Sequence, residues 1–430
     1  MWEIMTNDIK VIVAHPGQQH SYRVAEALNK HGVLFKYITT VYDSQHSGLM
    51  SVVKKLVKRE DAKRASGRKS EYLEENKVIQ FCEFGGFVTL AILRIDKTKG
   101  RIFYNNWNRY ISNIFGKRVA KYAIKNNVDA VICYDANSMA CFSYLKKHAP
   151  NIVRIMDNAA PNRYGLFQEY QVLNKKYHVI DKQPDVFKRF LVDEKEALYY
   201  KEEALLAHKH IVASTFSKRM LTSIGVSEKK CAIIPYGFNR TDYVEVRREN
   251  TSKLKFLFVG EISAQKGIFN YIDVAKKYKG QVEFHAAGGG IKNLASNYKR
   301  DILSFINYHG YLMQSELFEL YQEMDVFVFP SLGDGFGFVV LEALSFGLPV
   351  ICSKNSVGRD IIENGQNGFL FDAGSTDELS KAIQWFIDNK GKMIHMRQAA
   401  INSVKDLTWD RYYEELAQKT IAMVESANVK

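Results

Sequence analysis

The sequence predicts an α/β protein in which two doubly wound, Rossmann-like domains face each other across a cleft. Short apolar runs alternate with helical segments, which is the pattern of a parallel sheet covered on both faces. This pattern occurs twice, before and after a polar, charged segment near residues 236–253. In addition, a chain of 430 residues is too long for a single hydrophobic core.

The first domain is predicted to span residues 1–235. Its first apolar run ends in the polar sequence PGQQHS and leads into a helix, and residues 128–148 repeat this plan. The predicted strands are DIKVIVAH (8–15), VDAVICYDAN (128–137), NIVRIMDNAAP (151–161) and KHIVAS (209–214).

The second domain is predicted to span residues 236–410, and a helix at about 411–430 is expected to pack back on the first domain. Ligands of doubly wound sheets bind beyond the carboxyl ends of the strands, so the cleft is the predicted site. The predicted strands are LKFLFVGEIS (254–263), VEFHAAGGG (282–290), INYHGYL (306–312), MDVFVFPS (324–331), PVICSK (349–354) and GFLFDAG (368–374).

Positive charge is concentrated in residues 51–126. This stretch holds 18 Lys and Arg against 7 Asp and Glu, a net +11 of the chain's +13. Such asymmetry indicates an acidic partner, which could be anionic lipid, a phosphorylated glycan carrier or nucleic acid. We set nucleic acid aside because no recognised binding module accompanies the charge.

Within this stretch, residues 107–127 carry an apolar stripe at helical spacing. The stripe is either part of the core, with the neighbouring cations on a solvated face, or an interfacial surface that docks on anionic lipid together with residues 52–69. Its members are Trp107, Tyr110, Ile111, Ile114, Phe115, Val119 and Tyr122.

Cysteine usage and the amino terminus favour a cytoplasmic protein, peripheral on the inner face of the cytoplasmic membrane. The five cysteines form no CxxC pair, which fits a reducing compartment. The sequence WEIMTNDIK after Met1 lacks the apolar core of a secretory signal. The uncharged run FGGFVTLAIL (84–93) is half as long as a membrane-spanning helix.

The sequence PSLGDGFGFVVLEALSFGLPV (330–350) places three glycines and Asp334 in a short turn before a predicted helix. Glycine lets the backbone approach a ligand closely, and the unpaired N–H groups of a helix start suit a diphosphate. Asp334 in the loop and Glu342 about one turn into the helix can accept hydrogen bonds from hydroxyls on either side. The arrangement predicts binding of a nucleotide-sugar.

These motifs resemble those of the retaining glycosyltransferases of family 4, which have the GT-B architecture. The Glu-x7-Glu signature of that family maps onto Asp334 and Glu342. Further matching segments cover roughly residues 210 to 415, whereas the first 200 residues match only in plan. The matching segments are VASTFSKRMLTSIGVSEKKCAIIPYGFN (212–239), FLFVGEISAQKG (256–267), HGYLMQSELFELYQEMDVFVFPS (309–331) and GRDIIENGQNGFLF (358–371).

The resemblance implies a role for several residues of the second domain. Glu342 would bind the ribose hydroxyls, Asp334 would lie beside the donor sugar, and Lys266 would neutralise the diphosphate. The remaining donor-binding candidates are Gly335, Phe336, Gly337, Phe338 and Val339 in the loop and helix start, Gly310, Tyr311 and Leu312 around the base, Glu261, and Gly17 in the first domain.

Three positions depart from the family pattern. Asp334 stands where the family usually has Glu, Glu261 where it often has Arg, and Asp157 where many members carry His. A glutamate at 261 would repel a diphosphate if it pointed inward. We include Asp157 with Asp334 and Lys266 among the catalytic candidates, and His20, Asn158 and Arg163 are the acceptor-side candidates.

The implied reaction moves a sugar from a nucleotide-diphosphate sugar, UDP-sugar first, to a hydroxyl of a glycan or lipid-linked acceptor in surface-polysaccharide synthesis. No Asp-x-Asp occurs in the sequence, so we expect no metal and no cofactor. The helix start at Phe338 and Lys266 would instead stabilise the departing diphosphate. The alternatives are a nucleotide-sugar epimerase or inverting transferase of the same architecture, and a non-catalytic nucleotide-sugar-binding protein.

Overall fold

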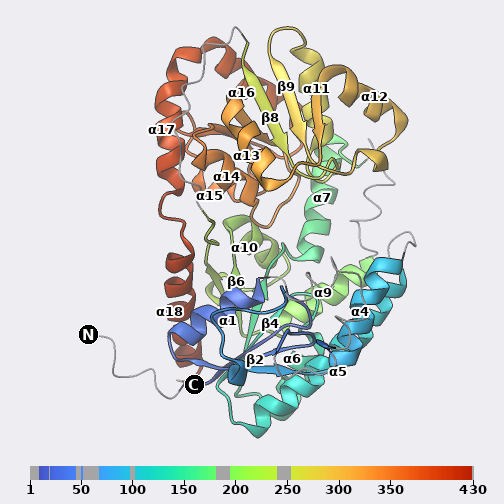
Figure 1. Cartoon of the computed structure of the whole chain (residues 1–430), viewed down its shortest axis with the longest axis vertical. Coiled ribbons are helices and arrows are strands. Elements are labelled where there is room, and N and C mark those ends of the chain that lie inside the picture. Colours follow the sequence, from blue (N-terminus) through green and yellow to red (C-terminus); the bar gives the residue numbers. More distant parts are fainter. Residues whose placement is uncertain are drawn as a thin grey trace.

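The computed structural model describes residues 9–18, 20–44, 50–51, 67–96, 102–180, 194–239 and 253–428. Two separate parallel sheets, each covered by helices, confirm the predicted fold class. In Figure 1 the two sheets lie one above the other along the longest axis. Most of the basic segment 52–69 and part of the predicted inter-domain segment, 240–252, lie outside the described residues.

The first sheet is built from residues 11 to 233 and has the order β3-β2-β1-β4-β5-β6-β7, with every pair parallel. The predicted strands correspond to β1, β4, β5 and β6, whereas β2, β3 and β7 were not predicted. The strands are β1 (Val11–Ala14), β2 (Leu34–Thr39), β3 (Val78–Gln80), β4 (Ala130–Tyr134), β5 (Val153–Asn158), β6 (Lys209–Val212) and β7 (Cys231–Ile233).

Helices cover both faces of this sheet. Two of them begin with a side-chain cap: Asn162 accepts from two backbone amides at the start of α7, and Ser214 does so from Ser217 at the start of α10. The helices are α1 (Ser21–Lys30), α4 (Glu83–Ile95), α5 (Ile102–Lys125), α6 (Met139–His148), α7 (Arg163–Tyr177), α9 (Glu194–Leu205) and α10 (Thr215–Thr222), with the 3-10 turns η1 (Glu75–Lys77) and η2 (Glu228–Lys230).

The second sheet has the order β10-β9-β8-β11-β12-β13 and is also wholly parallel. Each of its six strands falls within a predicted segment. The strands are β8 (Lys255–Val259), β9 (Glu283–Ala287), β10 (Asn307–Gly310), β11 (Val326–Phe329), β12 (Val350–Ser353) and β13 (Gly368–Phe371).

Helices of 4 to 13 residues accompany this sheet, and the 20-residue α18 comes last. They are α11 (Ile268–Lys277), α12 (Ser296–Phe305), α13 (Gln314–Glu323), α14 (Phe338–Ser345), α15 (Gly358–Ile361), α16 (Thr376–Asp388), α17 (Met393–Val404) and α18 (Trp409–Asn428), with the 3-10 turns η3 (Ile291–Asn293) and η4 (Lys390–Lys392).

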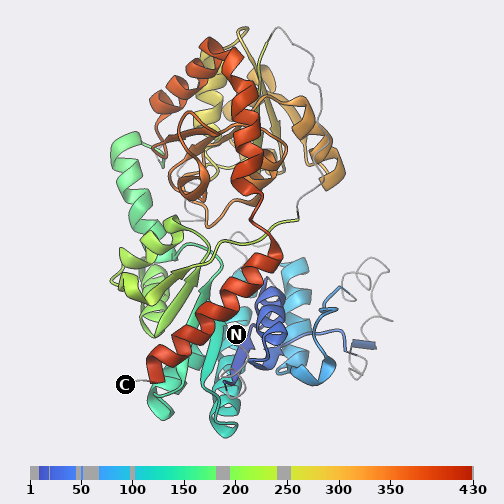
Figure 2. The ribbon, with the colours of Figure 1, turned by 90° about the vertical axis from the view of Figure 1, so that its left-hand side faces the viewer.

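The last helix, α18, leaves the second domain and packs along α1 of the first, as Figure 2 shows in red. Its apolar side chains Tyr412, Leu416 and Val424 are fully buried there. The guanidinium of Arg23 lies over the Trp409 ring at 4.7 Å and donates to the Tyr413 hydroxyl at 2.6 Å. One face of the first domain is therefore completed by the end of the described chain.

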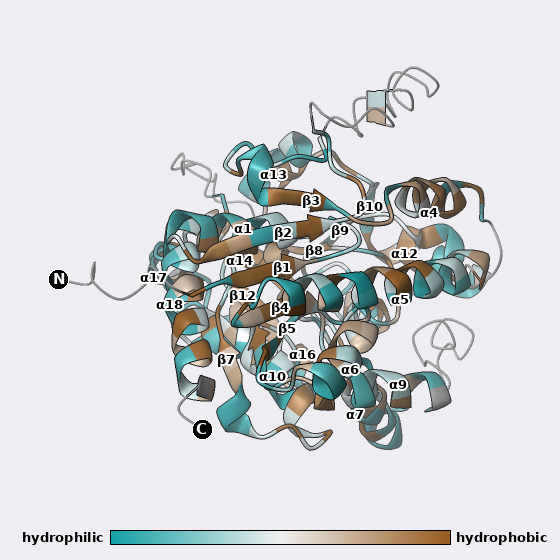
Figure 3. Cartoon of the chain, turned by 90° about the horizontal axis from the view of Figure 1, so that it is seen from below, coloured by the Kyte–Doolittle hydropathy of each residue, from teal (hydrophilic) through white to brown (hydrophobic). Residues whose placement is uncertain are grey.

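The core follows the apolar strands. Seen from below in Figure 3, β1 and β4 are hydrophobic and lie among helices that carry hydrophilic residues. The predicted stripe on α5 is divided: Ile111, Phe115 and Val119 are buried, whereas Tyr110 is exposed. The middle of α5 is thus core, and its amino-terminal part is not.

Candidate functional site

The carboxyl ends of the two sheets meet at the domain boundary. The loop after β11 reaches the first domain, where the Ser214 hydroxyl donates to the carbonyl of Gly335 at 2.6 Å and that of Ser217 does so at 3.2 Å. A Cβ on Gly335 would lie 3.1 Å from Pro161 Cδ and 3.3 Å from the Ala159 carbonyl oxygen. A side chain at position 335 would require the strand-end loop of β5 to shift by a few tenths of an ångström.

The loop 330–337 has a fixed shape before α14 begins. The Asp334 amide donates to the Asn355 carbonyl at 2.9 Å, and the Asp334 carboxylate accepts from the Phe336 amide at 3.2 Å. Gly337 has φ +87°, a left-handed conformation that turns the chain into the helix at Phe338. The Phe336 amide, which was predicted to face the donor, is thus engaged by Asp334.

Lys266 and Asp334 form an ion pair at the head of this loop. Both side chains are largely buried, with exposed fractions of 27% for Lys266 and 14% for Asp334. The Lys266 ammonium also lies 5.7 Å from the centre of the Phe329 ring. The structure therefore brings together two predicted site residues, and they contact each other.

Glu342 lies on α14, in contact with the core of the second domain. The hydroxyl of the fully buried Tyr321 donates to its Oε2 at 3.2 Å. Burial raises the pKa of Glu342 above its ordinary value, although the hydrogen bond from Tyr321 acts in the opposite direction. The Tyr321 contact was not predicted, because the sequence shows Tyr321 only as an apolar position of the preceding helix.

Backbone hydrogen bonds tie together the strand ends of β8, β9 and β10. The Gly288 amide donates to the Gly310 carbonyl at 2.6 Å, and the Ile262 amide donates to the Gly289 carbonyl at 2.7 Å. Of the predicted residues here, Glu261 and Tyr311 are exposed, while Gly310 and Leu312 are half-buried. The run HAAGGG was a signal for this contact that the donor-site prediction did not use.

In the first domain, His20 and Asp157 lie together. The His20 Nε2 is 3.1 Å from Asp157 Oδ2 and 3.2 Å from the Tyr236 hydroxyl. Burial alone would lower the pKa of His20, but the charge and hydrogen bond of buried Asp157, with a smaller contribution from Asp135, raise it above its ordinary value. His20 and Asp157 were each predicted as site residues, but their contact was not predicted, and neither was Tyr236.

The Asp135 carboxyl follows β4, beside this pair, and its pKa is raised to about 6, mainly by burial. Deeper still, the Glu203 carboxylate accepts from the amides of Ala136, Ser138 and Met139 at 2.7 to 2.9 Å. Burial raises the pKa of Glu203 to about 7. Neither acid was predicted, although Asp135 ends a predicted strand in the same way as Asp157.

The other predicted residues of the first domain have partners of their own. The buried Asn158 donates its side-chain amide to the carbonyls of Met156 and Ile211, each at 3.0 Å, so it joins neighbouring strands rather than facing outward. Arg163 donates to the Tyr200 hydroxyl at 2.7 Å. The Gly17 amide donates to His15 Nδ1 at 2.7 Å.

Residues 239–403 match the family model described as glycosyl transferases group 1. The match covers most of the second domain, which is thus similar in sequence to the group 1 glycosyl transferases. Loop 330–337, Lys266 and Glu342 all lie inside this matched range, and the His20–Asp157 pair lies outside it.

Curated relatives match the chain over about half of its length. It is 24% identical over 217 residues to an N,N'-diacetylbacillosaminyl-diphospho-undecaprenol alpha-1,3-N-acetylgalactosaminyltransferase of Campylobacter jejuni, covering 47% of this chain and 57% of that protein. It is 26% identical over 218 residues to an uncharacterised 41.2 kDa protein in the cps region of Klebsiella pneumoniae, covering 47% and 59% respectively. The chain thus spans less than two thirds of the length of these relatives.

Solved structures share the fold over nearly the whole chain. Sucrose-phosphate synthase of Thermosynechococcus elongatus superposes with a TM-score of 0.62 and 17% identity, covering 97% of this chain and all of that one. An Anabaena protein, HepE, in complex with UDP and glucose, gives 0.58 and 14%, covering 96% of this chain and all of that one. These likenesses show that the first and second domains together form a GT-B fold.

The described residues contain no cluster of three or more His, Cys, Asp or Glu side chains that could hold a metal ion. Among the helices of the described ranges, none combines the length and the apolar character needed to cross a bilayer.

Proposed function

We propose that the chain transfers a sugar from a nucleotide-diphosphate sugar, a UDP-sugar first, to a hydroxyl of a glycan or lipid-linked acceptor, with retention of the anomeric configuration. The observation that carries this proposal is the loop 330–337 with Lys266 and Asp334 at its head, joined to α14 and Glu342. This loop lies inside the matched glycosyl transferase range and touches the first domain at Gly335.

The donor diphosphate would bind between Lys266 and the amino end of α14. That helix start offers unpaired amides and a partial positive charge, and Lys266 supplies a full one. Fixed positive groups at the departing diphosphate stabilise the charge that develops there, so we propose a metal-independent reaction. Glu342, steadied by Tyr321, would accept from the ribose hydroxyls.

Membrane-linked polysaccharide synthesis is the proposed setting. The names of the relatives refer to a diphospho-undecaprenol acceptor, a cps region and, for a protein of Escherichia coli that is 25% identical over 245 residues, lipopolysaccharide. The cation-rich residues 51–126 support peripheral attachment to an anionic membrane at its cytoplasmic face.

An inverting transferase is the second candidate, favoured by one observation. His20 and Asp157 form a hydrogen-bonded pair at 3.1 Å, and an inverting reaction needs a base of this kind for the acceptor hydroxyl. The raised pKa of His20 weighs against it, because a larger fraction of the ring is already protonated near neutral pH.

The first experiment is a thermal-shift panel of UDP-, GDP- and ADP-sugars, since a bound donor raises the unfolding temperature by mass action. Glu342→Ala and Lys266→Ala should lose the shift, and Glu316→Ala, an exposed acid on α13, is the control. A shift of equal size in all three variants would contradict the site.

With a donor identified, nucleotide release and the anomer of the product decide between the remaining functions. Release together with a retained anomer supports the proposal, whereas an inverted anomer supports the His20–Asp157 mechanism. Donor binding without any release would leave the non-catalytic alternative.

A further inference from the structure

Helices α4 and α5 form a hairpin that stands beyond the sheet on the side of the domain boundary. At its base, Gly86 of α4 abuts Thr40 and Val41, which directly follow the carboxyl end of β2. Thr89 and Trp107 join the two helices, with the indole N–H donating to the hydroxyl at 3.1 Å. Ile95, the last residue of α4, comes nine residues after Gly86, so the far end of the helix lies about 14 Å beyond that base. Figure 1 shows the hairpin rising beside α9.

Three apolar side chains are exposed where the described parts of α4 and α5 end and begin. Ile95, Ile102 and Phe103 have exposed fractions of 74%, 57% and 66%. Within α4 only Gly85 and Gly86 are buried, although the helix sequence EFGGFVTLAILRI is mostly apolar. Single exposed apolar residues are common, but three of them at the adjoining ends of α4 and α5 indicate a surface that contacts another apolar phase. We call Ile95, Ile102 and Phe103 the hairpin tip.

Cations continue from the tip along α5. The helix contains no Asp or Glu and five exposed basic residues. Phe103, Tyr110, Lys117 and Lys121 share one outward face, because they are spaced by seven, seven and four residues. The face therefore begins apolar and becomes basic. The five basic residues are Arg109, Lys117, Arg118, Lys121 and Lys125.

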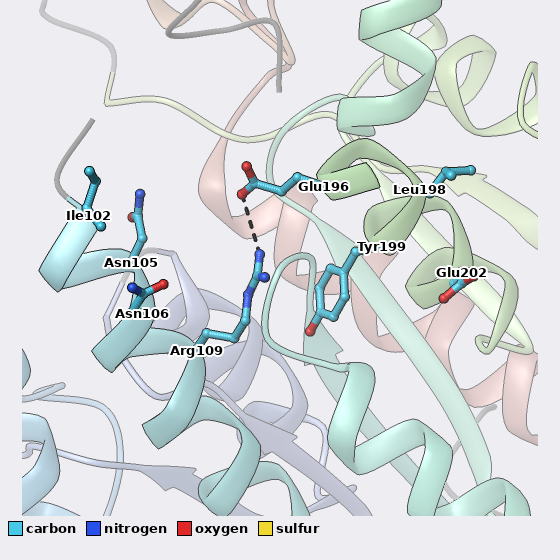
Figure 4. Close-up of a pocket in the computed structure, with 8 residues that line it drawn as sticks. All are labelled: Ile102, Asn105, Asn106, Arg109, Glu196, Leu198, Tyr199 and Glu202. Carbon is cyan, nitrogen blue, oxygen red and sulfur yellow. Dashed lines mark hydrogen bonds and ion pairs between the residues drawn. The ribbon is translucent and has the colours of Figure 1, made fainter. Parts of the chain in front are cut away.

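A groove of about 670 Å³ between α5 and α9 begins at the tip, with Ile102 in its wall (Figure 4). Arg109 lies inside it, 3.4 Å from Glu196 across the groove and 4.9 Å above the ring of Tyr199. Glu196 in turn accepts from the Tyr200 hydroxyl at 3.5 Å, and Tyr200 is the partner of Arg163. A series of polar contacts thus runs from Arg109 in the groove to Arg163 on the predicted acceptor side.

We propose that the hairpin tip inserts into the headgroup layer of an anionic bilayer, with the cations of α5 on the lipid phosphates, so that the groove opens towards the membrane. This proposal rests on the proposed function in one respect, because a lipid-linked acceptor would give the chain a reason to bind a membrane. An apolar end followed by cations suits an interface that is apolar inside and anionic outside. A second copy docked symmetrically would instead bring its own five cations against these five.

Vesicle sedimentation of the full chain tests the tip. With vesicles of phosphatidylcholine and phosphatidylglycerol, Ile95→Asn with Phe103→Asn should lower the partition coefficient about tenfold or more, because two apolar side chains leave the lipid phase. Leu303→Asn with Ile394→Asn, at 67% and 71% exposure in the second domain, is the matched control and should bind as wild type. Lys117→Gln with Lys121→Gln should weaken binding to anionic vesicles and reduce its salt dependence.

A second measurement reports insertion directly. The indole fluorescence of Phe103→Trp should be quenched by brominated lipids more strongly than that of wild type, and that of Leu303→Trp should not. Equal partitioning of the tip variant and wild type, or no added quenching at position 103, would overturn the proposal. Loss of a wild-type dimer in the tip variant, without vesicle binding by wild type, would assign the tip to a second copy and overturn it as well.

Failure of this proposal is separable from failure of the donor site. The tip variants should keep the thermal shift with the nucleotide-sugar, because the tip lies in the first domain away from loop 330–337. If wild type binds vesicles but shows no thermal shift with any donor, the proposed function is contradicted while the membrane proposal for the hairpin tip is still supported.

Discussion

The Lys266 ammonium forms an ion pair with the Asp334 carboxylate. The cation predicted to neutralise the diphosphate therefore contacts the acid predicted to lie beside the donor sugar. A diphosphate that binds at Lys266 would share it with Asp334, and Asp334 would then be freer to turn towards a sugar hydroxyl. Donor binding and the orientation of Asp334 are coupled in this arrangement.

Asp334→Asn should therefore separate nucleotide affinity from transfer. Removing the charge releases Lys266, and for a partly exposed ion pair we expect a difference of about 1 kcal/mol. We expect UDP to bind equally or up to about fivefold more tightly, while sugar transfer falls strongly. Calorimetry with UDP alone and a transfer assay check this. Weaker UDP binding in this variant would show that the pair itself shapes the site.

Tyr321→Phe should weaken donor binding without unfolding the domain. The ring stays in place, but Glu342 loses its hydrogen bond, which is typically a change of about 1 kcal/mol. We expect a donor dissociation constant about fivefold higher and a small fall in unfolding temperature. Tyr308→Phe, which removes a hydroxyl bonded to the Gly288 carbonyl, is the comparison. Unchanged donor affinity in Tyr321→Phe would separate Glu342 from the ribose.

The contribution of two buried acids to the free energy of unfolding should fall as pH rises from about 4.5 to 7. Burial raises the pKa of Glu203 from 4.5 to about 7 and that of Asp135 from 3.8 to about 6, so in this window these two groups hold more protons in the folded chain than in the unfolded one. The raised pKa of His20 acts with the same sign, because its contribution is present below 6.5 and is lost as pH rises. Burial lowers the pKa of His208 and of His210 from 6.5 to about 4, so the contribution of these two histidines changes in the opposite direction.

Glu203→Gln should remove the Glu203 contribution to this pH dependence, since the variant cannot titrate at position 203. One pKa unit corresponds to about 1.4 kcal/mol, so the free energy of unfolding at pH 5 minus that at pH 7.5 should be about 2 to 3 kcal/mol smaller in the variant than in wild type. Denaturant unfolding at several pH values measures it. The exposed Glu202→Gln is the control, and an equal slope in both variants would refute the assignment to Glu203.

Ser214→Ala combined with Ser217→Ala should loosen the domain boundary. Both hydroxyls donate to the Gly335 carbonyl, which is buried, so their loss leaves an acceptor without these two donors at a cost of about 1 to 3 kcal/mol. We expect lower turnover and faster hydrogen exchange in loop 330–337. Ser223→Ala, whose hydroxyl caps its own helix end, should change neither.

The sequence predicts strands well where apolar runs are buried, as in β8, β9, β11 and β12 of the second sheet. It missed β3 and β7, edge strands of three residues each that are only half-buried, and β2, whose sequence LFKYIT places a lysine in the run. These strands form through pairing with a neighbour rather than through their own pattern.

Site chemistry was harder to predict than site position. The glycine-rich turn and Glu342 stand out in the sequence, but Lys266 and Asp334 are 68 residues apart, and Tyr321 looks like any apolar helix position. Asn158, a polar residue at a strand end, was predicted to face the acceptor, whereas its side-chain amide donates to the Ile211 carbonyl within the sheet. Which polar groups satisfy each other depends on contacts that no local pattern records.

The placement of α18 on α1 bears on how the chain is made. While the ribosome is still synthesising the second domain, the partners of Arg23, Glu26 and His31 in residues 409–428 do not yet exist. The apolar side of α1 that Tyr412 and Leu416 will cover is meanwhile open to solvent or to a chaperone. The first domain, although it is translated first, is therefore completed only after α18 has been synthesised.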